Sequence, residues 1–334
     1  MLDTAAGDPF ARLEEFLAAH RGSPVDVYLG YGLAAPEPAD PCPLPLLACR
    51  AGPQPRRRAG AFWVGAWERT WSEHDHAAAI AQAREAIGRG DVYQVNLVQH
   101  LRAPFRGDPA GVEAALRPLG AEFAHALHGD GWSVVSATPE MFLRTRGDRV
   151  FTMPIKGTRP AASTEPIAAN AKDRAEHVMI VDLERNDLGR VCTPGSVRVS
   201  GFLEERPMAG VRHLVSTVEG RLRPGVGTAE LLRATFPGGS VTGAPKLAAI
   251  EHISRLEPVG RGASMGAIGR VHPNGDLELG LTIRTFAIAA DEIHLWVGGG
   301  IVWDSDAAAE VEESLVKARP LLRLLEPQQR ILPS

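Results

Sequence analysis

The sequence is poor in lysine, cysteine and long apolar runs, and each shortage narrows what the chain can be. Only four of its 36 basic residues are lysines, and none of them lies among the first 155 residues. Three cysteines in 334 residues do not provide a disulfide framework and are typical of a reducing compartment. No segment approaches the roughly 18 consecutive apolar residues of a membrane span, and no basic-then-apolar leader begins the chain. These shortages predict a cytoplasmic protein without membrane association.

The charge balance argues against a polyanion-binding protein. The formal net charge is −4, and basic residues are interspersed with acidic ones instead of forming a basic patch. Hydrophobic residues make up 44% of the chain and charged residues 23%, so a sizeable core can form. We therefore expect a folded protein that does not bind nucleic acid.

Clusters of short strands separated by helices predict an α+β fold. Ile80, Ala83 and Ile87 recur at helical spacing between Ser72 and Gly90, which are typical helix-capping residues. Further helices are expected over 169–190, 229–236, 245–258 and from about residue 304, and strands over 91–98, 131–155 and 267–302, with a hairpin at 274–275. Because βαβ alternation is missing, antiparallel sheets are favoured over a doubly wound parallel sheet.

The same pattern divides the chain into three parts. Residues 1–70 have weak periodicity and frequent Pro and Gly, and we expect a partial N-terminal element that packs on the core. Residues 71–326 are expected to form the main domain, and 327–334 a C-terminal tail. In the strand over 91–98, Tyr93 is expected on an apolar face and Gln94 on a polar one.

Two of the expected helices carry carboxylate pairs one turn apart. Asp173 and Glu176 form the first pair, and Glu310 and Glu313 form the second, with Lys317 one turn further along the same face. Mg²⁺ prefers oxygen ligands, so two such pairs could hold it together if the helices face each other. A solvated, salt-bridged helix face explains the same spacing, and the residues alone leave both interpretations open.

Glycine-rich segments offer places where a backbone could approach a ligand closely. FPGGSVTGAPK lacks the P-loop order of glycine then lysine, but Ser240 or Thr242 is expected to cap the helix that follows it. Lys156 stands between Pro154 and Gly157, on an expected turn that closes a buried strand, where desolvation could make its amine nucleophilic. A loop lysine bonded to a carbonyl is the alternative interpretation.

An ordered set of motifs resembles the chorismate-utilising enzymes over about residues 70–325. The motifs are PIKGT (154–158), KDRAEH (172–177), VDLERNDLGRV (181–191), HLVSTVEG (213–220), FPGGSVTGAPK (236–246), IRT (283–285) and GGGIVWDSDAAAEVEESLVKA (298–318). The resemblance implies two packed antiparallel β-sheets flanked by helices, with 71–326 as the chorismate-binding catalytic domain. It also implies a shortened N-terminal region.

The resemblance implies a magnesium-dependent site and assigns roles to its residues. For the metal it implies Glu176 and Glu313 as direct ligands, supported by Asp173 and Glu310. For catalysis it implies Lys156 as the nucleophile at C2 of chorismate, Glu140 as the acid that helps the C4 hydroxyl depart, and His213. For substrate binding it implies Thr158, Ser240, Ser264, Arg284, Gly298, Gly299, Gly300 and Lys317, with the Arg284 guanidinium holding a substrate carboxylate.

Within this family, two positions favour the branch that makes 4-amino-4-deoxychorismate, a precursor of 4-aminobenzoate and folate. Gln94 stands where water-adding members have a lysine base, and Lys156 stands where anthranilate-forming members have alanine. Ammonia would come from a glutamine amidotransferase partner, because no GxCxG nucleophile segment occurs in the chain. Ser264 replaces a tyrosine that is common in the family. An anthranilate-forming component I is one alternative, and a non-catalytic chorismate-binding subunit is another.

Overall fold

A computed structural model describes residues 2–3, 8–34, 37–53, 58–160, 166–167, 170–208 and 211–326. For residues 158–160, 171–172 and 208 it describes the backbone alone. The expected C-terminal tail over 327–334 lies outside the described residues.

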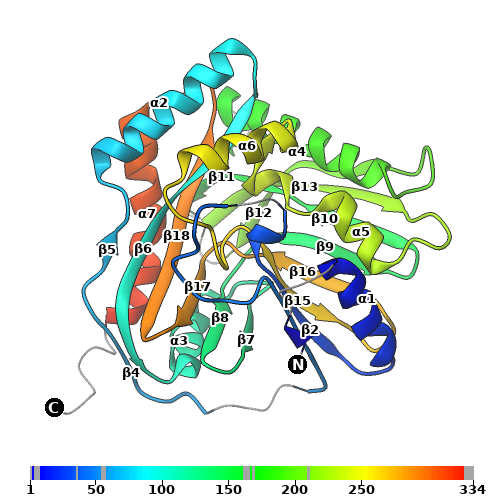
Figure 1. Cartoon of the computed structure of the whole chain (residues 1–334). Helices are drawn as coiled ribbons and strands as arrows, with labels where there is room; N and C mark the ends of the chain where they lie inside the picture. The colour runs from blue at the N-terminus through cyan, green and yellow to red at the C-terminus, as the bar shows by residue number, and fades with distance from the viewer. Residues whose placement is uncertain are drawn as a thin grey trace.

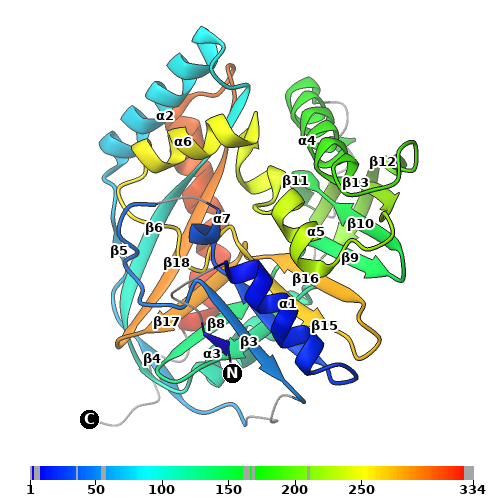
Figure 2. The same cartoon turned by 45° about the vertical axis from the view of Figure 1, so that its right-hand side comes forward.

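Two antiparallel β-sheets form the framework of the protein, and helices flank them (Figure 1, Figure 2). The larger sheet has ten strands in the order β1-β3-β2-β15-β16-β9-β10-β13-β11, with β12 also paired to β13. The smaller sheet has eight strands in the order β14-β6-β18-β17-β8-β7, with β4 and β5 also paired to β6. This architecture confirms the predicted α+β fold.

The described elements have the following bounds. The larger sheet contains β1 (Leu2–Asp3), β2 (Val25–Leu29), β3 (Leu47–Ala51), β9 (Met141–Arg146), β10 (Arg149–Met153), β11 (Ile155–Pro160), β12 (Arg198–Met208), β13 (Val211–Arg221), β15 (Ala267–Val271) and β16 (Leu277–Leu281). The smaller sheet contains β4 (Phe62–Val64), β5 (Glu68–Arg69), β6 (Gln94–Gly107), β7 (His125–His128), β8 (Trp132–Ser136), β14 (Gly243–Ala244), β17 (Thr285–Ala289) and β18 (Glu292–Ile301). The helices are α1 (Pro9–Ala19), α2 (Glu73–Arg89), α3 (Pro109–Leu116), α4 (Ala171–Gly189), α5 (Thr228–Thr235), α6 (Lys246–Leu256) and α7 (Ala307–Leu325), with short 3₁₀ turns η1 (Tyr31–Leu33), η2 (Arg117–Leu119) and η4 (Gly239–Val241).

Helix ends follow the capping chemistry of the sequence. The Ser72 hydroxyl accepts a hydrogen bond from the Asp75 amide at the start of α2, and Gly90 ends that helix in the left-handed conformation. The predicted hairpin joins β15 to β16, and Gly275 supplies the positive φ of +89° that its turn requires. Both predictions are confirmed.

Strand β6 differs from its prediction in length and in the faces that it buries. It runs to Gly107 and pairs with ten consecutive residues of β18. Tyr93 lies outside the strand with 67% of its surface exposed, so its expected place on an apolar face is wrong. Both faces of the strand are buried, because Val95 and Leu97 lie in the larger apolar cluster while Gln94 and Asn96 line a polar interior.

The first 70 residues are part of the main framework. Strands β2 and β3 extend the larger sheet through pairing of β2 with β15. Helix α1 packs on α5, where the Phe10 and Phe236 rings meet edge to face and the Glu14 carboxylate accepts a hydrogen bond from the Ala229 amide. The N-terminal region therefore completes the sheet.

Two apolar clusters hold these layers together. The larger one includes Val27, Phe142 and Leu279 and lies against both sheets. The smaller one includes Phe286 and Leu295 and packs the outer face of the smaller sheet against α3 and α7. Burying each large side chain of this kind stabilises the fold by roughly 1.5–3 kcal/mol.

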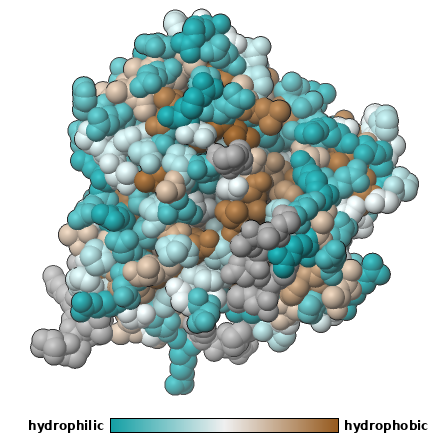
Figure 3. All heavy atoms as spheres, viewed as in Figure 1, coloured by the Kyte–Doolittle hydropathy of each residue, from teal (hydrophilic) through white to brown (hydrophobic). Residues whose placement is uncertain are grey.

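The face shown in Figure 3 is mostly hydrophilic, with small apolar groups near its centre. Among the described residues, no helix is long and apolar enough to cross a membrane. All three cysteines are buried as free thiols.

Candidate active site

Lys156 lies on strand β11 and points into a group of polar side chains. Its backbone pairs with Leu214 of β13, so the predicted turn at Lys156 is wrong. The ladder shifts register at Gly157, whose φ of +62° forms a bulge after the lysine. The lysine Nζ donates to Glu176 Oε1 at 2.6 Å and to the Ser240 carbonyl at 3.5 Å. With 13% of its side chain exposed, Lys156 forms a largely buried ion pair with Glu176.

Glu140 lies close to this lysine, immediately before β9, and is 4% exposed. The Ser240 hydroxyl donates to Glu140 Oε1 at 2.7 Å, and the Ile155 amide donates to the same oxygen at 3.3 Å. Burial raises the pKa of Glu140, against the hydrogen bond from Ser240 and the charges of Lys156 and Arg284. Both bonds go to Oε1, so Oε2 is the atom suited to hold a proton and donate it.

Gly300 has to be a glycine because two side chains approach its backbone. Gln94 Nε2 donates to Glu176 Oε1 at 2.8 Å, directly over this position. A Cβ on Gly300 would lie 2.0 Å from Gln94 Nε2 and 2.5 Å from Glu176 Oε1. The glycine on β18 thus lets a helix carboxylate and a strand amide meet against the sheet.

The run of three glycines occupies a free edge of β18. β17 pairs with β18 only up to Leu295, whereas β6 pairs with it as far as Ile301. Among the described strands, residues 298–301 therefore have a partner on one side only. Backbone amides and carbonyls on the other side are available to a ligand or a side chain. The Lys317 amine uses one of them, because it donates to the Gly298 carbonyl at 2.8 Å.

Helix α7 presents its acidic residues at this glycine edge. Glu313 Oε1 lies 2.8 Å from the Lys317 amine, and both side chains are about half exposed. Glu310 is 8% exposed and accepts a hydrogen bond from the Ser305 hydroxyl at 2.7 Å. A Cβ on Gly299 would lie 3.5 Å from Glu310 Oε2, so this glycine faces α7 while Gly300 faces Glu176.

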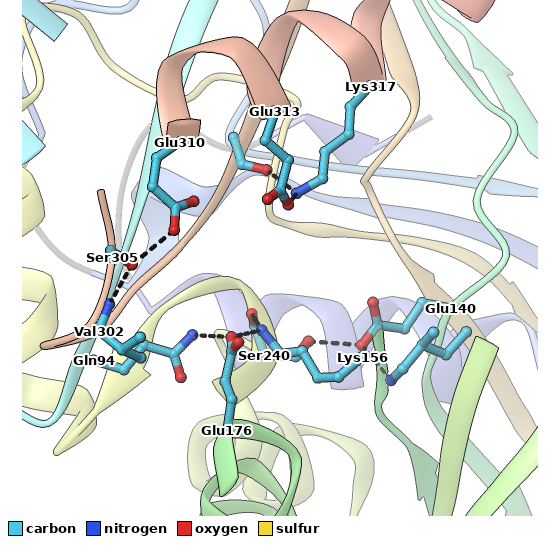
Figure 4. Close-up of polar contacts among 12 residues, drawn as sticks. Gln94, Glu140, Lys156, Glu176, Ser240, Val302, Ser305, Glu310, Glu313 and Lys317 are labelled. Atoms are coloured by element: carbon cyan, nitrogen blue, oxygen red, sulfur yellow. Dashed lines mark hydrogen bonds and ion pairs between the residues drawn. The ribbon is translucent and has the colours of Figure 1, made fainter. Parts of the chain in front are cut away.

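The four carboxylates predicted to bind magnesium form two groups. Figure 4 shows Glu313 beside Lys317 and Glu310 beside Ser305, both apart from the group around Glu176 and Lys156. Asp173 belongs to the α4 side, where its Oδ2 would lie 3.5 Å from a Cβ on Gly157. Among the described residues, no group of three acidic, histidine or cysteine side chains is placed to hold a metal ion. The ligand types suit Mg²⁺, but lysines neutralise Glu176 and Glu313 in this arrangement.

His213 and Arg284 flank the same interior. Burial lowers the pKa of His213, which keeps its imidazole neutral. Its Nδ1 lies 3.2 Å from the Gly157 carbonyl, an acceptor, so Nδ1 carries the hydrogen. Arg284 precedes β17 with a φ of +50°, and burial lowers its pKa against the opposing charge of Glu140. A strained backbone at an arginine is typical of a functional position.

Three further predictions concern residues around this interior. The Ser264 side chain is buried and donates weakly to the Thr282 carbonyl at 3.5 Å. Thr158 pairs through its backbone with His213, and its side chain lies outside the described set. The expected capping by Ser240 or Thr242 is wrong, because Pro245 precedes α6 and has no side-chain bond there. Those hydroxyls instead donate to Glu140 and to the Gly238 carbonyl.

Sequence reasoning missed one contact and one acidic pair at this site. Gln94 was expected on the polar face of its strand and at the position of the lysine base of water-adding members, but its bond to Glu176 was not predicted. Glu184 and Asp187 lie within the recognised VDLERNDLGRV motif but received no role. Their spacing from Glu176, at i+8 and i+11, was the available signal, because it places all three on one face of α4.

Comparisons with known proteins identify the family. Residues 36–323 match the family described as chorismate binding enzyme. The chain is 42% identical over 272 residues to aminodeoxychorismate synthase component 1 of Klebsiella aerogenes, covering 79% of this chain and 60% of that protein. It is 40% identical over 266 residues to anthranilate synthase component 1 of Streptomyces coelicolor, covering 77% of this chain and 52% of that protein. The chain thus matches only 52–60% of the length of these two relatives.

Solved structures show the same architecture. Anthranilate synthase component I from Streptococcus pneumoniae superposes with a TM-score of 0.84 at 26% identity, over 95% of this chain and 86% of that one. The menaquinone-specific isochorismate synthase of Escherichia coli gives a TM-score of 0.79 at 18% identity, over 97% of this chain and 84% of that one, which supports the fold alone. With the matched residues covering most of its length, the chain belongs to the chorismate binding enzyme family.

Proposed function

We propose that this protein is an aminodeoxychorismate synthase component I, which converts chorismate and ammonia to 4-amino-4-deoxychorismate. One observation carries the proposal: the Lys156 amine lies 3.5 Å from the carbonyl of Ser240, whose hydroxyl bonds to the buried acid Glu140. A nucleophile and a leaving-group acid joined through one serine suit a substitution in which one group attacks as another departs.

In the proposed reaction, the Lys156 amine bonds to C2 of chorismate while the C4 hydroxyl departs and the two ring double bonds shift. Glu140 gives its proton to that hydroxyl, so water leaves. Lys156 must first lose a proton, and Glu176 is the acceptor in contact with it. Ammonia then bonds to C4, the double bonds shift back, and the lysine is expelled from C2. Arg284 and the free edge at Gly298–Gly300 would hold substrate carboxylates.

We further propose magnesium and an amidotransferase as the partners of this site. Magnesium would be held by Asp173, Glu176, Glu310 and Glu313, and would supply positive charge for the acidic groups of chorismate when bound. Ammonia would come from a separate glutamine amidotransferase, in line with the component 1 naming of the relatives. Folate biosynthesis is the pathway that such a product would serve.

A product assay tests the proposal. Purified protein with chorismate, Mg²⁺ and ammonium should form 4-amino-4-deoxychorismate, detected as 4-aminobenzoate after a separate lyase is added. Formation of anthranilate would favour the alternative suggested by the anthranilate synthase relatives. Binding of chorismate without its consumption would instead identify a non-catalytic subunit.

The role of Lys156 has its own test. Lys156→Ala should lower kcat by at least about a thousandfold, because the covalent step is lost, while the Kd for chorismate changes only a few-fold. Single-turnover kinetics and calorimetric binding measure the two quantities. Arg185→Ala removes an exposed charge from α4 and is the matched control. Unchanged turnover in Lys156→Ala would remove the lysine from the mechanism.

A further inference from the structure

A second acidic pair on α4 lies behind the glycine-rich loop and has no part in the proposed chemistry. Glu184 and Asp187 share the helix face that carries Glu176, about two and three turns further along. Each is only 3% exposed, which acidic side chains tolerate only with bonded partners. Their described bonded partners all belong to the segment from Thr235 to Lys246.

Glu184 holds the peptide between Gly238 and Gly239, one residue before Ser240. Its Oε1 accepts a hydrogen bond from the Gly239 amide at 3.0 Å. A Cβ on Gly239 would lie 2.6 Å from Leu183 and 3.0 Å from Glu184 Oε1, so helix and loop are in direct contact. Ser240 follows at once, with its hydroxyl on Glu140 and its carbonyl near the Lys156 amine.

Asp187 and Lys246 fasten both ends of the same loop. The Lys246 amine forms an ion pair with Asp187 and donates to the Thr235 carbonyl at 2.8 Å. The lysine side chain is 12% exposed and the aspartate 4%. Because Thr235 ends α5 and Lys246 begins α6, this pair ties the start and the end of the loop to α4.

We propose that Glu184 is a positioning residue that orients Ser240, with the Asp187–Lys246 pair holding the loop around it, so that α4 controls the hydrogen bond donated to Glu140. The inference rests on the proposed function, since Glu140 is the acid of that reaction. Fixing the Gly239 amide fixes the direction of the next peptide, and a shift of about 1 Å in such a group can cost about a hundredfold in rate.

The charges of Glu184 and Glu140 also influence each other. Burial raises the pKa of Glu184 to about 7, and the charge of Lys246 opposes this while Asp187 and Glu140 add to it. Glu184 and Glu140 therefore disfavour each other's ionised form. The hydrogen bond to Gly239 survives either state, because a protonated carboxyl keeps a carbonyl oxygen that accepts.

Two substitutions separate positioning from a general structural role. Glu184→Gln keeps an oxygen for the Gly239 amide, whereas Glu184→Leu does not. Glu184→Leu should lower kcat/KM for chorismate by about ten- to a hundredfold. Compared with Glu184→Gln, which lacks the same charge, Glu184→Leu should also show an alkaline limb of the pH profile at higher pH, because Glu140 loses the bond from Ser240 that lowers its pKa. Glu184→Gln should stay within a few-fold of wild type without an upward shift, as should Asp182→Asn on the exposed face of α4.

A second readout does not depend on turnover. Hydrogen exchange of the Gly239 amide should be faster in Glu184→Leu and remain slow in Glu184→Gln. If wild type consumes no chorismate, the proposed function fails while the exchange experiment still judges the positioning. Equal exchange in the two variants, or lost activity in Glu184→Leu with an alkaline limb no higher than in Glu184→Gln, overturns the inference.

If Glu184→Leu does not fold, a second variant, Lys246→Met, tests the inference. Lys246→Met removes the ion pair with Asp187 and the bond to the Thr235 carbonyl that hold the two ends of the loop. The inference then requires faster exchange of the Gly239 amide and an upward shift of the alkaline limb of the pH profile. Slow exchange in a folded Lys246→Met protein would overturn the inference.

Discussion

At the scale of single residues, Ser240 connects two groups with opposite proton requirements. Lys156 must lose a proton to attack, and Glu140 must keep one to give away. Ser240 reaches the first through its carbonyl and the second through its hydroxyl. One residue, through its backbone carbonyl and its hydroxyl, can therefore influence both groups without itself reacting.

The hydroxyl of Ser240 gives a pH prediction. Glu140 acts as an acid only while protonated, so activity should fall as pH rises through its pKa. The bond from Ser240 lowers that pKa. In Ser240→Ala the loss of activity should therefore move to higher pH, as measured by kcat/KM for chorismate across pH. A downward shift would show that the falling limb belongs to another group.

The sequence could name candidate site residues, but it could not show the contacts between them. The lysine, the acid and both carboxylate pairs were named from motifs and spacing. The bond between Gln94 and Glu176 joins residues 82 positions apart, and only the fold, in which α4 packs on β14 and β14 pairs with the start of β6, brings them together. Alternation along a strand also could not show that the polar face of β6 is buried, because an interior lined with partners accepts amides.

At the scale of elements, the glycines of β18 lie between side chains of α4 and side chains of α7. Gly300 faces Gln94 and Glu176, and Gly299 faces Lys317 and Glu310. A strand with ordinary side chains there would push both helices away. The three glycines are therefore not equivalent, although the sequence presents them as one run.

Alanine substitutions should distinguish the two faces of β18. Gly300→Ala places a Cβ 2.0 Å from Gln94 Nε2, in a rigid, buried pair, and should lower kcat/KM by more than about tenfold. Gly299→Ala meets the flexible end of Lys317 at 3.3 Å and should cost less. Chorismate kinetics, with thermal unfolding as a control for folding, give the comparison. Equal losses in both variants would contradict this picture.

Helix α7 gives a prediction about metal binding. Lys317 neutralises Glu313, so Lys317→Met should tighten Mg²⁺ binding by about three- to tenfold if these carboxylates bind the ion. Calorimetric titration with MgCl₂ in the absence of chorismate measures this. Arg319→Met removes an exposed cation that pairs with Glu312 on the same helix, and it should change the Kd little. An unchanged Kd in Lys317→Met would argue against Glu313 as a ligand.

Helices were predicted better than strands. α2, α5 and α6 begin and end within a few residues of their expected bounds, because caps and helical spacing are local signals. The bulge at Gly157 and the length of β6 depend on partner strands far along the chain. The local pattern around Lys156 therefore indicated a turn where pairing with β13 produces a strand.

At the scale of the whole molecule, Arg261 joins segments from across the chain. It is fully buried and forms a paired interaction with Glu257, while donating to the carbonyls of Val241 and Asn96. The Tyr31 ring lies 4.5 Å from its guanidinium carbon. The N-terminal region, β6 and the end of the loop before α6 therefore meet on one side chain.

Removing this arginine should strongly destabilise the fold. Arg261→Met leaves the Glu257 carboxylate buried without its partner, which should cost about 3–5 kcal/mol in the free energy of unfolding. Arg255→Met breaks only an exposed pair with Glu251 and should leave the unfolding midpoint nearly unchanged. Urea unfolding followed by circular dichroism tests both. A cost below about 1 kcal/mol would show that the segments do not depend on this contact.

The scarcity of lysine, combined with the burial of Lys156 and Lys246, also determines how the protein can be labelled chemically. Lys317 is 46% exposed at the side chain, against 13% for Lys156 and 12% for Lys246. Apart from the N-terminal amine and Lys172, the amine most accessible to an amine-selective reagent is therefore that of Lys317, beside Gly298–Gly300. A fluorophore attached to Lys317 would lie within the proposed site, so its fluorescence would report whether the site is occupied.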